Sequence, residues 1–402
     1  MPAELGAPLG GYGGIRDRNA TSTYDPPQAR ALLLEGSGKR VAWVSLDIVI
    51  ARPELRSALL ASVADQRLDA VLIAATHTHS GPGGYIEGFL AERITSGAFD
   101  PTLRDALVSA AARAIRAAQD DLRPVRVAAA EAELTLATNR RVASGPREVS
   151  LPVLSLEPLE DGASPIVVFA YGAHPTVWSP NNHAFSADYV GAARRWLESR
   201  GLRALYLAGP MGDQRPTSRL GELGSGDSQL ESKQVEEIGA AVGEATYAAL
   251  ESLQSGSSEL ALVEQELELP EFRLRPLCAL WWLAPFVRAP TLRFLSPSVP
   301  IQVYALGPVR LLAVPAEPSA ALGEKLRAAI AEVFPGSVRF VVAHANDWAG
   351  YAVTSESYER GGYEACLSFR GADFDAWLVE RGSHAARALA ARAPATQRNA
   401  AE

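Results

Sequence analysis

The sequence has little of what would mark a specialised class of protein. Only two cysteines, Cys278 and Cys366, occur in 402 residues, so no disulfide framework is required and a reducing, cytoplasmic compartment is the simplest prediction. Basic residues number 38 against 46 acidic ones, which argues against a nucleic-acid partner. No hydrophobic run is long enough for a transmembrane segment, and the N-terminus lacks the pattern of a secretory signal.

What the chain does contain is an alternation of strand-like and helix-like segments. Continuous apolar runs predict buried strands at residues 41–50, 69–75, 166–171, 204–208, 309–314 and 338–343. A more exposed strand is predicted at 125–136. Apolar periodicity predicts helices at residues 53–66, 103–118, 187–199, 228–253 and 319–333. The pattern predicts an α/β fold, a layered mixed β-sheet with flanking helices. We expect one domain over residues 1–390 and a disordered tail at 391–402.

Histidine is scarce, and its placement is the strongest sign of function. The chain has six histidines, and three of them, His77, His79 and His174, follow two predicted strands. Glu317 follows another. Loops at the carboxyl ends of strands are where α/β sheets bind ligands. An H-x-H pair alone also fits two hydrogen-bonded loop histidines. With a further histidine and a glutamate, it resembles a catalytic zinc site, in which three protein ligands leave room for a water.

Longer motifs resemble the neutral (non-lysosomal) ceramidase family. The segments THTHSGPGGY, NRRV, AHPTVW, GPMGDQRP, VRLLAVPAEP and NDWAGYAVTSESYERGGYEA follow the order of that family's catalytic domain, from about residue 14 to residue 364. The resemblance implies the fold of that domain and a zinc amidase. Ceramidases continue into an immunoglobulin-like domain, which we expect to be missing here.

The resemblance also implies a zinc-ligand set. The first histidine of the THTH motif matches His77, and the histidine of the HP motif matches His174. The glutamate that follows the VP strand matches Glu317, and a tyrosine further on matches Tyr351.

Three more residues match positions that act on the substrate in the family. The resemblance places His79 at the reacting carbonyl. It gives Arg140 and Tyr363 the task of polarising or positioning the scissile amide.

One position departs from the family pattern. The family carries a catalytic serine in a G-D-V-S-P segment, where this chain has G-D-Q-R-P with Arg215. Arginine is charged at any working pH and cannot replace a neutral hydroxyl. A zinc-activated water needs no side-chain nucleophile, so we expect Arg215 to alter substrate positioning more than hydrolysis itself. Guanidinium groups prefer carboxylates. Arg215 and Arg140 would therefore suit an N-acyl amino acid or a small peptide better than ceramide, unless Arg215 pairs with Asp213 or another acid.

The sequence thus predicts a zinc-dependent hydrolase of a linear amide, whose substrate is a small or peptide-like molecule. One alternative is a peptide hydrolase or cyclase of a biosynthetic pathway on the same fold. Another is a non-catalytic binding protein in which Arg215 holds a ligand's carboxylate. A serine hydrolase is much less favoured, because no G-x-S-x-G motif is present. Nothing in the sequence indicates the oligomeric state.

Four other features carry weaker predictions. Asp47 could orient a zinc-binding histidine through its second nitrogen, or could cap a turn. His344 is expected to be a hydrogen-bonded loop histidine. The apolar insert with Trp281 and Trp282 could wall a substrate pocket or serve a dimer contact, although core packing is favoured. The glycine-rich segment 10–14 is expected to let the N-terminal chain pass close to the site.

Overall fold

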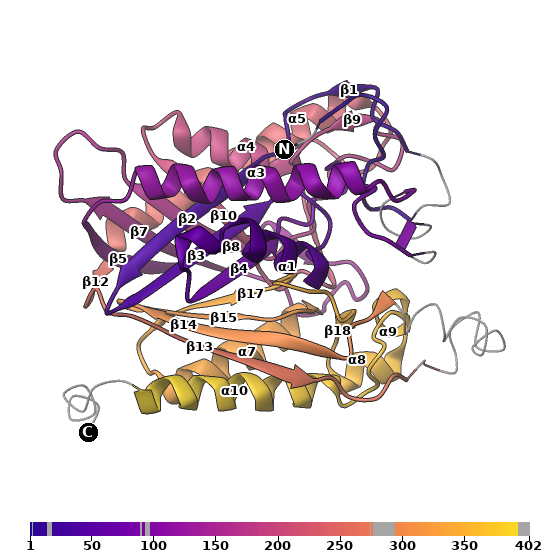
Figure 1. Cartoon of the computed structure of the whole chain (residues 1–402). Coiled ribbons are helices and arrows are strands. Elements are labelled where there is room, and N and C mark those ends of the chain that lie inside the picture. Colours follow the sequence, from indigo (N-terminus) through magenta and orange to yellow (C-terminus); the bar gives the residue numbers. More distant parts are fainter. Residues whose placement is uncertain are drawn as a thin grey trace.

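Three β-sheets pack against one another through their inner faces, and helices cover the outer faces (Figure 1). The computed structural model describes residues 1, 3–13, 18–88, 91–92, 97–273, 275 and 294–392. The predicted α/β fold with mixed sheets and flanking helices is confirmed, with three main sheets in place of one. The Trp281–Trp282 insert and nearly all of the predicted tail lie outside the described residues, so those predictions stay open.

The first sheet carries the strand that leads into the H-x-H motif. Its strands are, in spatial order, β2 (Ala29–Gly36), β3 (Lys39–Leu46) and β4 (Ala70–Ala75). Its outer face packs against α1 (Pro53–Ser62) and α3 (Pro101–Asp120). Side chains alternate across β3, so Val41 and Trp43 lie in the core shared by the three sheets while Ala42 and Val44 face the helices. Asp100 caps α3 by accepting a hydrogen bond from the Thr102 N–H.

The second sheet leads into the HP motif. Its strands are, in spatial order, β10 (Arg203–Ala208), β8 (Ile166–Tyr171), β7 (Ser150–Pro158), β5 (Val125–Glu133) and β12 (Gln254–Ser255). Its outer face packs against α4 (Asp188–Glu198) and α5 (Ser228–Ala249). Two glycines of α5, Gly239 and Gly243, form the face that packs closely against α4. A Cβ on Gly239 would lie 2.3 Å from the Ala192 Cβ, so only glycine lets α4 approach this closely.

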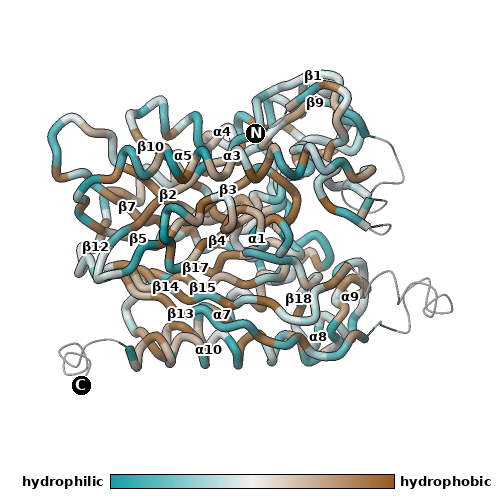
Figure 2. The backbone as a smooth tube through the Cα atoms, viewed as in Figure 1, coloured by the Kyte–Doolittle hydropathy of each residue, from teal (hydrophilic) through white to brown (hydrophobic). Residues whose placement is uncertain are grey.

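Two strands of the third sheet precede the segments that carry Glu317 and Tyr351. Its strands are, in spatial order, β13 (Leu260–Glu268), β14 (Ser298–Leu306), β15 (Val309–Ala313) and β17 (Val338–Val342). Its outer face packs against α7 (Ala320–Val333) and α10 (Phe374–Arg392). Figure 2 shows hydrophilic and hydrophobic stretches alternating along α10, as an amphipathic surface helix requires.

Short elements complete the fold. The two-stranded pairs are β1 (Ser22–Thr23) with β9 (Ala184–Phe185), β6 (Ala137–Asn139) with β11 (Gln214–Pro216), and β16 (Glu317–Pro318) with β18 (Tyr351–Ala352). The short helices are η1 (Ala64–Gln66), η3 (Leu250–Ser252), α8 (Ser355–Arg360) and α9 (Tyr363–Cys366). No helix in the described ranges combines the length and apolarity that crossing a membrane requires.

Each main sheet contains one parallel pair: β3 with β4, β8 with β10, and β15 with β17. The loops that follow these strands are joined by backbone hydrogen bonds. The Ala75 N–H donates to His344 O at 3.3 Å, which links the first sheet to the third. The Gly212 N–H donates to Pro318 O at 2.8 Å, which links the second to the third. The carboxyl ends of strands from all three sheets therefore meet at one place.

Candidate metal and active site

A cavity of about 770 Å³ lies where these loops meet. All the residues predicted for the site line it, although they come from distant parts of the chain. They are His77, His79, Arg140, His174, Arg215, Glu317, Tyr351 and Tyr363. The volume lies within the range usual for small-molecule sites, about 300–1,000 Å³.

His77 sits in the loop after β4 with one ring nitrogen fixed by the backbone. Its Nδ1 lies 2.6 Å from Val49 O, so Nδ1 must carry the proton and donate it. The Nε2 lone pair is then free to face the cavity. Burial lowers the pKa of His77 to about 4, so the ring is neutral at physiological pH, which is the form that binds metals.

His174, after β8, is held in the same way. Its Nδ1 lies 2.9 Å from Gln214 O and donates to it. Its Nε2 lies 2.8 Å from Glu317 Oε1, and the Nε2 of His77 lies 3.7 Å from the same oxygen. Burial lowers the pKa of His174 well below its ordinary value.

The lone pairs of two ring nitrogens thus face the same buried carboxylate oxygen. The Nε2 of His174 and the Oε1 of Glu317 have no hydrogen-bond partner in the described part of the chain. Electron pairs brought this close repel unless a cation lies among them. The residues present therefore fit a metal ion, and imidazole with carboxylate is a donor set suited to zinc.

Glu317 and Tyr351 are placed side by side by the parallel pairing of β16 with β18. The other carboxylate oxygen of Glu317, Oε2, accepts a hydrogen bond from Trp348 Nε1 at 3.3 Å. The Tyr351 hydroxyl accepts one from Arg140 Nη2 at 3.2 Å. We call the set His77, His174, Glu317 and Tyr351 the donor cluster.

His79 presents an N–H to this cluster. Its Nδ1 accepts a hydrogen bond from the Tyr12 N–H at 3.3 Å, so in the neutral ring the proton sits on Nε2. That Nε2 lies 3.4 Å from the Nε2 of His77. The N-terminal chain passes close to the site, as expected: a Cβ on Gly11 would lie 2.5 Å from the His79 ring. His79 can therefore donate a hydrogen bond to an oxygen bound next to the donor cluster.

Arg140 reaches the cluster and is held there by an ion pair and two further hydrogen bonds. Its Nε donates to Glu364 Oε1 at 2.8 Å, and its Nη2 donates to Gly212 O at 2.9 Å. Glu364 also pairs with Arg141. Arg140 thus holds the Tyr351 hydroxyl in place. Tyr363 lies on the more open side, 55% exposed, with its ring 5.8 Å from that of Tyr351.

Arg215 is the cation of the cavity that has no partner. It is exposed on β11, and within the described ranges its guanidinium makes no ion pair or hydrogen bond. The expected alternative, an ion pair with Asp213, is wrong because other groups occupy that carboxylate. Asp213 accepts hydrogen bonds from Asn139 Nδ2, Gln214 Nε2 and the Ala320 N–H. Arg140 and Arg141 share the carboxylate of Glu364, so Arg215 differs from them in having no ion pair within the described ranges.

Two weaker predictions also differ from the structure. Asp47 does not touch a histidine of the donor cluster, so the first of its two expected roles is wrong. It forms a buried two-bond ion pair with Arg194, at 3.0 and 2.7 Å, and accepts a hydrogen bond from the Gln28 N–H at 2.7 Å. His344 was expected to be hydrogen-bonded, but both its ring nitrogens lack a partner among the described residues. It stacks on His77 with ring centroids 4.0 Å apart. Its position directly after a buried strand is the same signal that identified His77.

Apolar residues form much of the remaining cavity lining. Trp348 contacts Phe294 and Phe369, with ring centroids 6.0 and 6.2 Å apart, and Ile50 and Leu367 also line the space. This lining suits a hydrocarbon chain. Histidines and a buried carboxylate that line one cavity define an α/β protein with a candidate metal site.

The comparisons with known proteins give the family. The family described as "Neutral/alkaline non-lysosomal ceramidase, N-terminal" matches residues 6–207, half of the chain. The chain therefore belongs to the neutral ceramidase family, a family of hydrolases. It is 33% identical to the neutral ceramidase of Mycobacterium tuberculosis over 34% of this chain and 23% of that protein.

Neutral ceramidase of Pseudomonas aeruginosa is similar over a longer stretch, 25% identical over 92% of this chain and 67% of that protein. The crystal structure of that enzyme superposes with a TM-score of 0.83 at 22% identity, covering 98% of this chain and 73% of the other. At this identity the likeness establishes the fold. The chain spans about a quarter of the first of these two relatives and about two thirds of the second.

Proposed function

We propose that this protein is a zinc-dependent amidase that hydrolyses an N-acyl amide bearing a carboxylate next to the scissile bond. The observation that carries the proposal is the unpaired guanidinium of Arg215 in the same cavity as the donor cluster. An N-acyl amino acid has the acyl chain and amide of a ceramide, but ends in a carboxylate. It would satisfy both the apolar lining and Arg215.

The donor cluster supports a zinc requirement. His77, His174 and Glu317 would hold the ion, with the Tyr351 hydroxyl beside them. Bound zinc would lower the pKa of a water to roughly 7 and polarise the amide carbonyl. No nucleophilic side chain is then needed where Arg215 replaces the family's serine.

The remaining groups have tasks that follow from their contacts. His79 would donate its Nε2–H to the carbonyl oxygen as negative charge develops there. Tyr363, near the opening, would position the amide or add a second donor. Arg140 would keep Tyr351 oriented. The acyl chain would occupy the lining formed by Phe294, Trp348 and Phe369.

The test compares two substrates that differ in one group. We expect the zinc-loaded protein to hydrolyse N-dodecanoylglycine with a kcat/KM at least about tenfold above that for N-dodecanoylethanolamine, because a hydrogen bond to a charged group is worth about 1.5–3 kcal/mol. Arg215→Ser should lower kcat/KM for the carboxylate substrate by about 10–100-fold and leave the neutral one nearly unchanged. Arg219→Ser is the matched control, since Arg219 lies outside the cavity lining and pairs with Glu237.

Two outcomes would contradict the proposal. An equal loss of kcat/KM for both substrates in Arg215→Ser would mean that Arg215 does not bind the substrate's carboxylate. Binding of N-dodecanoylglycine with no product from either substrate would favour the non-catalytic alternative. Ceramide should be assayed alongside, because Arg215→Ser restores the residue of the family pattern and is expected to improve its turnover.

A further inference from the structure

We infer that His344 is an additional ligand of the cation, a third imidazole beside His77 and His174. The inference rests on the proposed function only in that both require a metal at Glu317. His344 belongs to neither the predicted ligand set nor the catalytic residues implied by the family. It was singled out by its surroundings in the fold.

The side chain of His344 is fully buried, at 0% exposure, yet both its ring nitrogens lack a partner in the described part of the protein. A neutral imidazole always has one N–H and one lone pair. Leaving a buried polar group without a partner costs about 1–3 kcal/mol, and folded proteins leave few such groups. A bound cation would accept the lone pair and remove part of this cost.

The backbone holds His344 in place from two sides. Its N–H donates to Ala316 O at 3.1 Å, and its carbonyl accepts from the Ala75 N–H at 3.3 Å. Both His344 and His77 have left-handed backbone angles, with φ of 52° and 68°. Such angles in residues other than glycine cost about 1–3 kcal/mol and cluster at functional sites. The backbone conformation of the loops after β4 and β17 therefore holds these two rings next to each other.

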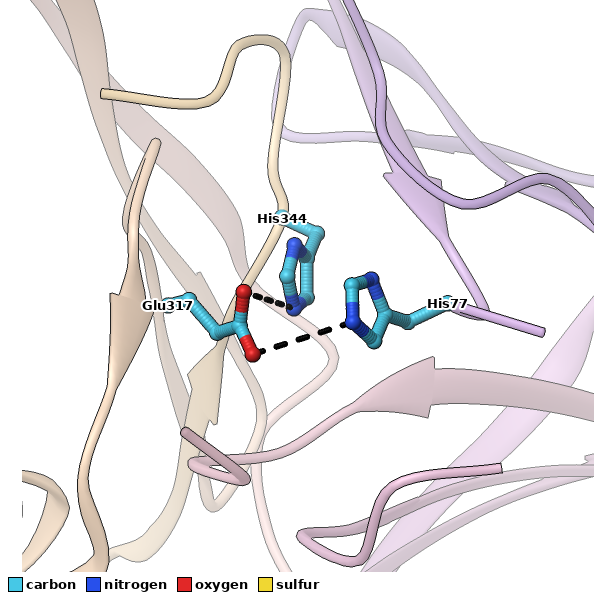
Figure 3. A group of neighbouring side chains, drawn as sticks. All are labelled: His77, Glu317 and His344. Atoms are coloured by element: carbon cyan, nitrogen blue, oxygen red, sulfur yellow. Dashed lines mark ion pairs between the residues drawn. The ribbon is translucent and has the colours of Figure 1, made fainter. Parts of the chain in front are cut away.

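The two rings face the same carboxylate (Figure 3). They stack with an interplanar angle of 16°. The Nε2 of His344 lies 4.0 Å from Glu317 Oε2, and the Nε2 of His77 lies 3.7 Å from Oε1. One ligand atom from each of the three residues lies within 4.8 Å of the others. Both oxygens of Glu317 thus have an imidazole nitrogen nearby.

A third imidazole changes which ions the site prefers. Imidazole suits zinc and cobalt, whereas carboxylate and water suit manganese and magnesium. His344 should therefore raise the affinity for zinc more than the affinity for manganese.

The experiment measures metal affinity, not turnover. Purified protein is stripped with a chelator and titrated with Zn²⁺, Co²⁺ or Mn²⁺ against a competing chelator. His344→Phe keeps a ring to stack on His77 and removes both nitrogens. We expect its Kd for Zn²⁺ to rise about 10–100-fold, with a smaller change for Mn²⁺ and an altered Co²⁺ absorption spectrum. His183→Phe is the matched control, because His183 bonds to Asn19 O away from the cavity lining.

Each outcome decides the question. A Kd for Zn²⁺ within twofold of the wild type, with an unchanged Co²⁺ spectrum, would overturn the role of His344 and leave the proposed function intact. If the wild type binds no metal, both proposals fail. If His344→Phe does not fold, as judged by circular dichroism, the smaller His344→Gln is titrated in the same way and the same two results apply.

Discussion

Two parts of one cavity are built on different principles. In the donor cluster, a backbone carbonyl fixes the second nitrogen of each histidine, and every member is buried. Arg215 lines the same cavity and is exposed, and its guanidinium has no partner in the part of the chain that the structure describes. The positions of the cluster residues therefore depend on the packing of three sheets. The position of the exposed Arg215 side chain does not. Substitutions at Arg215 can thus be made without disturbing the packing that holds the cluster.

Removing a member of the cluster should give the largest effect. We expect His174→Ala to weaken Zn²⁺ binding by more than about 100-fold, since even groups that only support a ligand contribute about 10–100-fold. Hydrolysis of every amide should fall together. Elemental analysis of wild type and variant, purified side by side, measures the first effect. Near-stoichiometric zinc in His174→Ala would show that the ion sits elsewhere.

The same substitution, arginine to methionine, can be made at Arg140 and at Arg215 to compare how much each side chain contributes to stability. Arg140→Met removes bonds to Glu364, Gly212 and Tyr351 from a side chain only 19% exposed. We expect a loss of about 1–3 kcal/mol in the free energy of unfolding, because partners in the interior lose their bonds. Arg215→Met should change it by less than about 0.5 kcal/mol, as exposed residues without such contacts usually do. Urea denaturation measures both. Equal losses would mean that Arg215 has a structural task.

The smallest predicted effect is a change in the stability of the metal-free protein, and it appears only at acidic pH. Burial, and the neighbouring His77, lower the pKa of His344 well below its ordinary value, while in the unfolded chain it stays near about 6.5. Below that pH the unfolded state binds a proton that the folded state does not. Metal-free wild type should therefore lose up to about 1.4 kcal/mol of stability per pH unit relative to His344→Phe as the pH falls from about 6.5.

Urea denaturation of the two metal-free proteins at pH 7.5, 6.5 and 5.5 tests this difference. The gap should widen toward acid and stay constant above about pH 7. A gap that does not change with pH would mean that His344 is not held in its neutral form.

The sequence was enough to locate a site residue wherever that residue directly follows a buried strand. Polar residues directly after continuous apolar runs identified His77, His174 and Glu317, and those runs are strands of the sheets. The same rule applied to His344, which follows the run ending in β17. The sequence alone favoured a hydrogen-bonded loop histidine at this position. A ligand role depends on which groups surround the ring in the fold, and one position in the chain does not show them.

Other features could not be read from the chain because they arise from tertiary packing. Strands β2, β7, β13 and β14 were not predicted, and β13 is partly exposed along its length. The division into three sheets depends on which faces pack together, and apolar runs do not specify this. The Tyr12 N–H that sets the His79 tautomer is a backbone group without a sequence signature. Whether Arg215 is paired depends on which groups already occupy Asp213.

The meeting of three sheets at one point also has a consequence for biosynthesis. His77 follows a strand of the first sheet, His174 one of the second, and Glu317 one of the third. Contacts between such distant segments form late, because loop closure over long stretches of chain is slow. A nascent chain that has left the ribosome only as far as the second sheet carries the H-x-H motif without its carboxylate. The proposed activity would then begin only when the last sheet has docked.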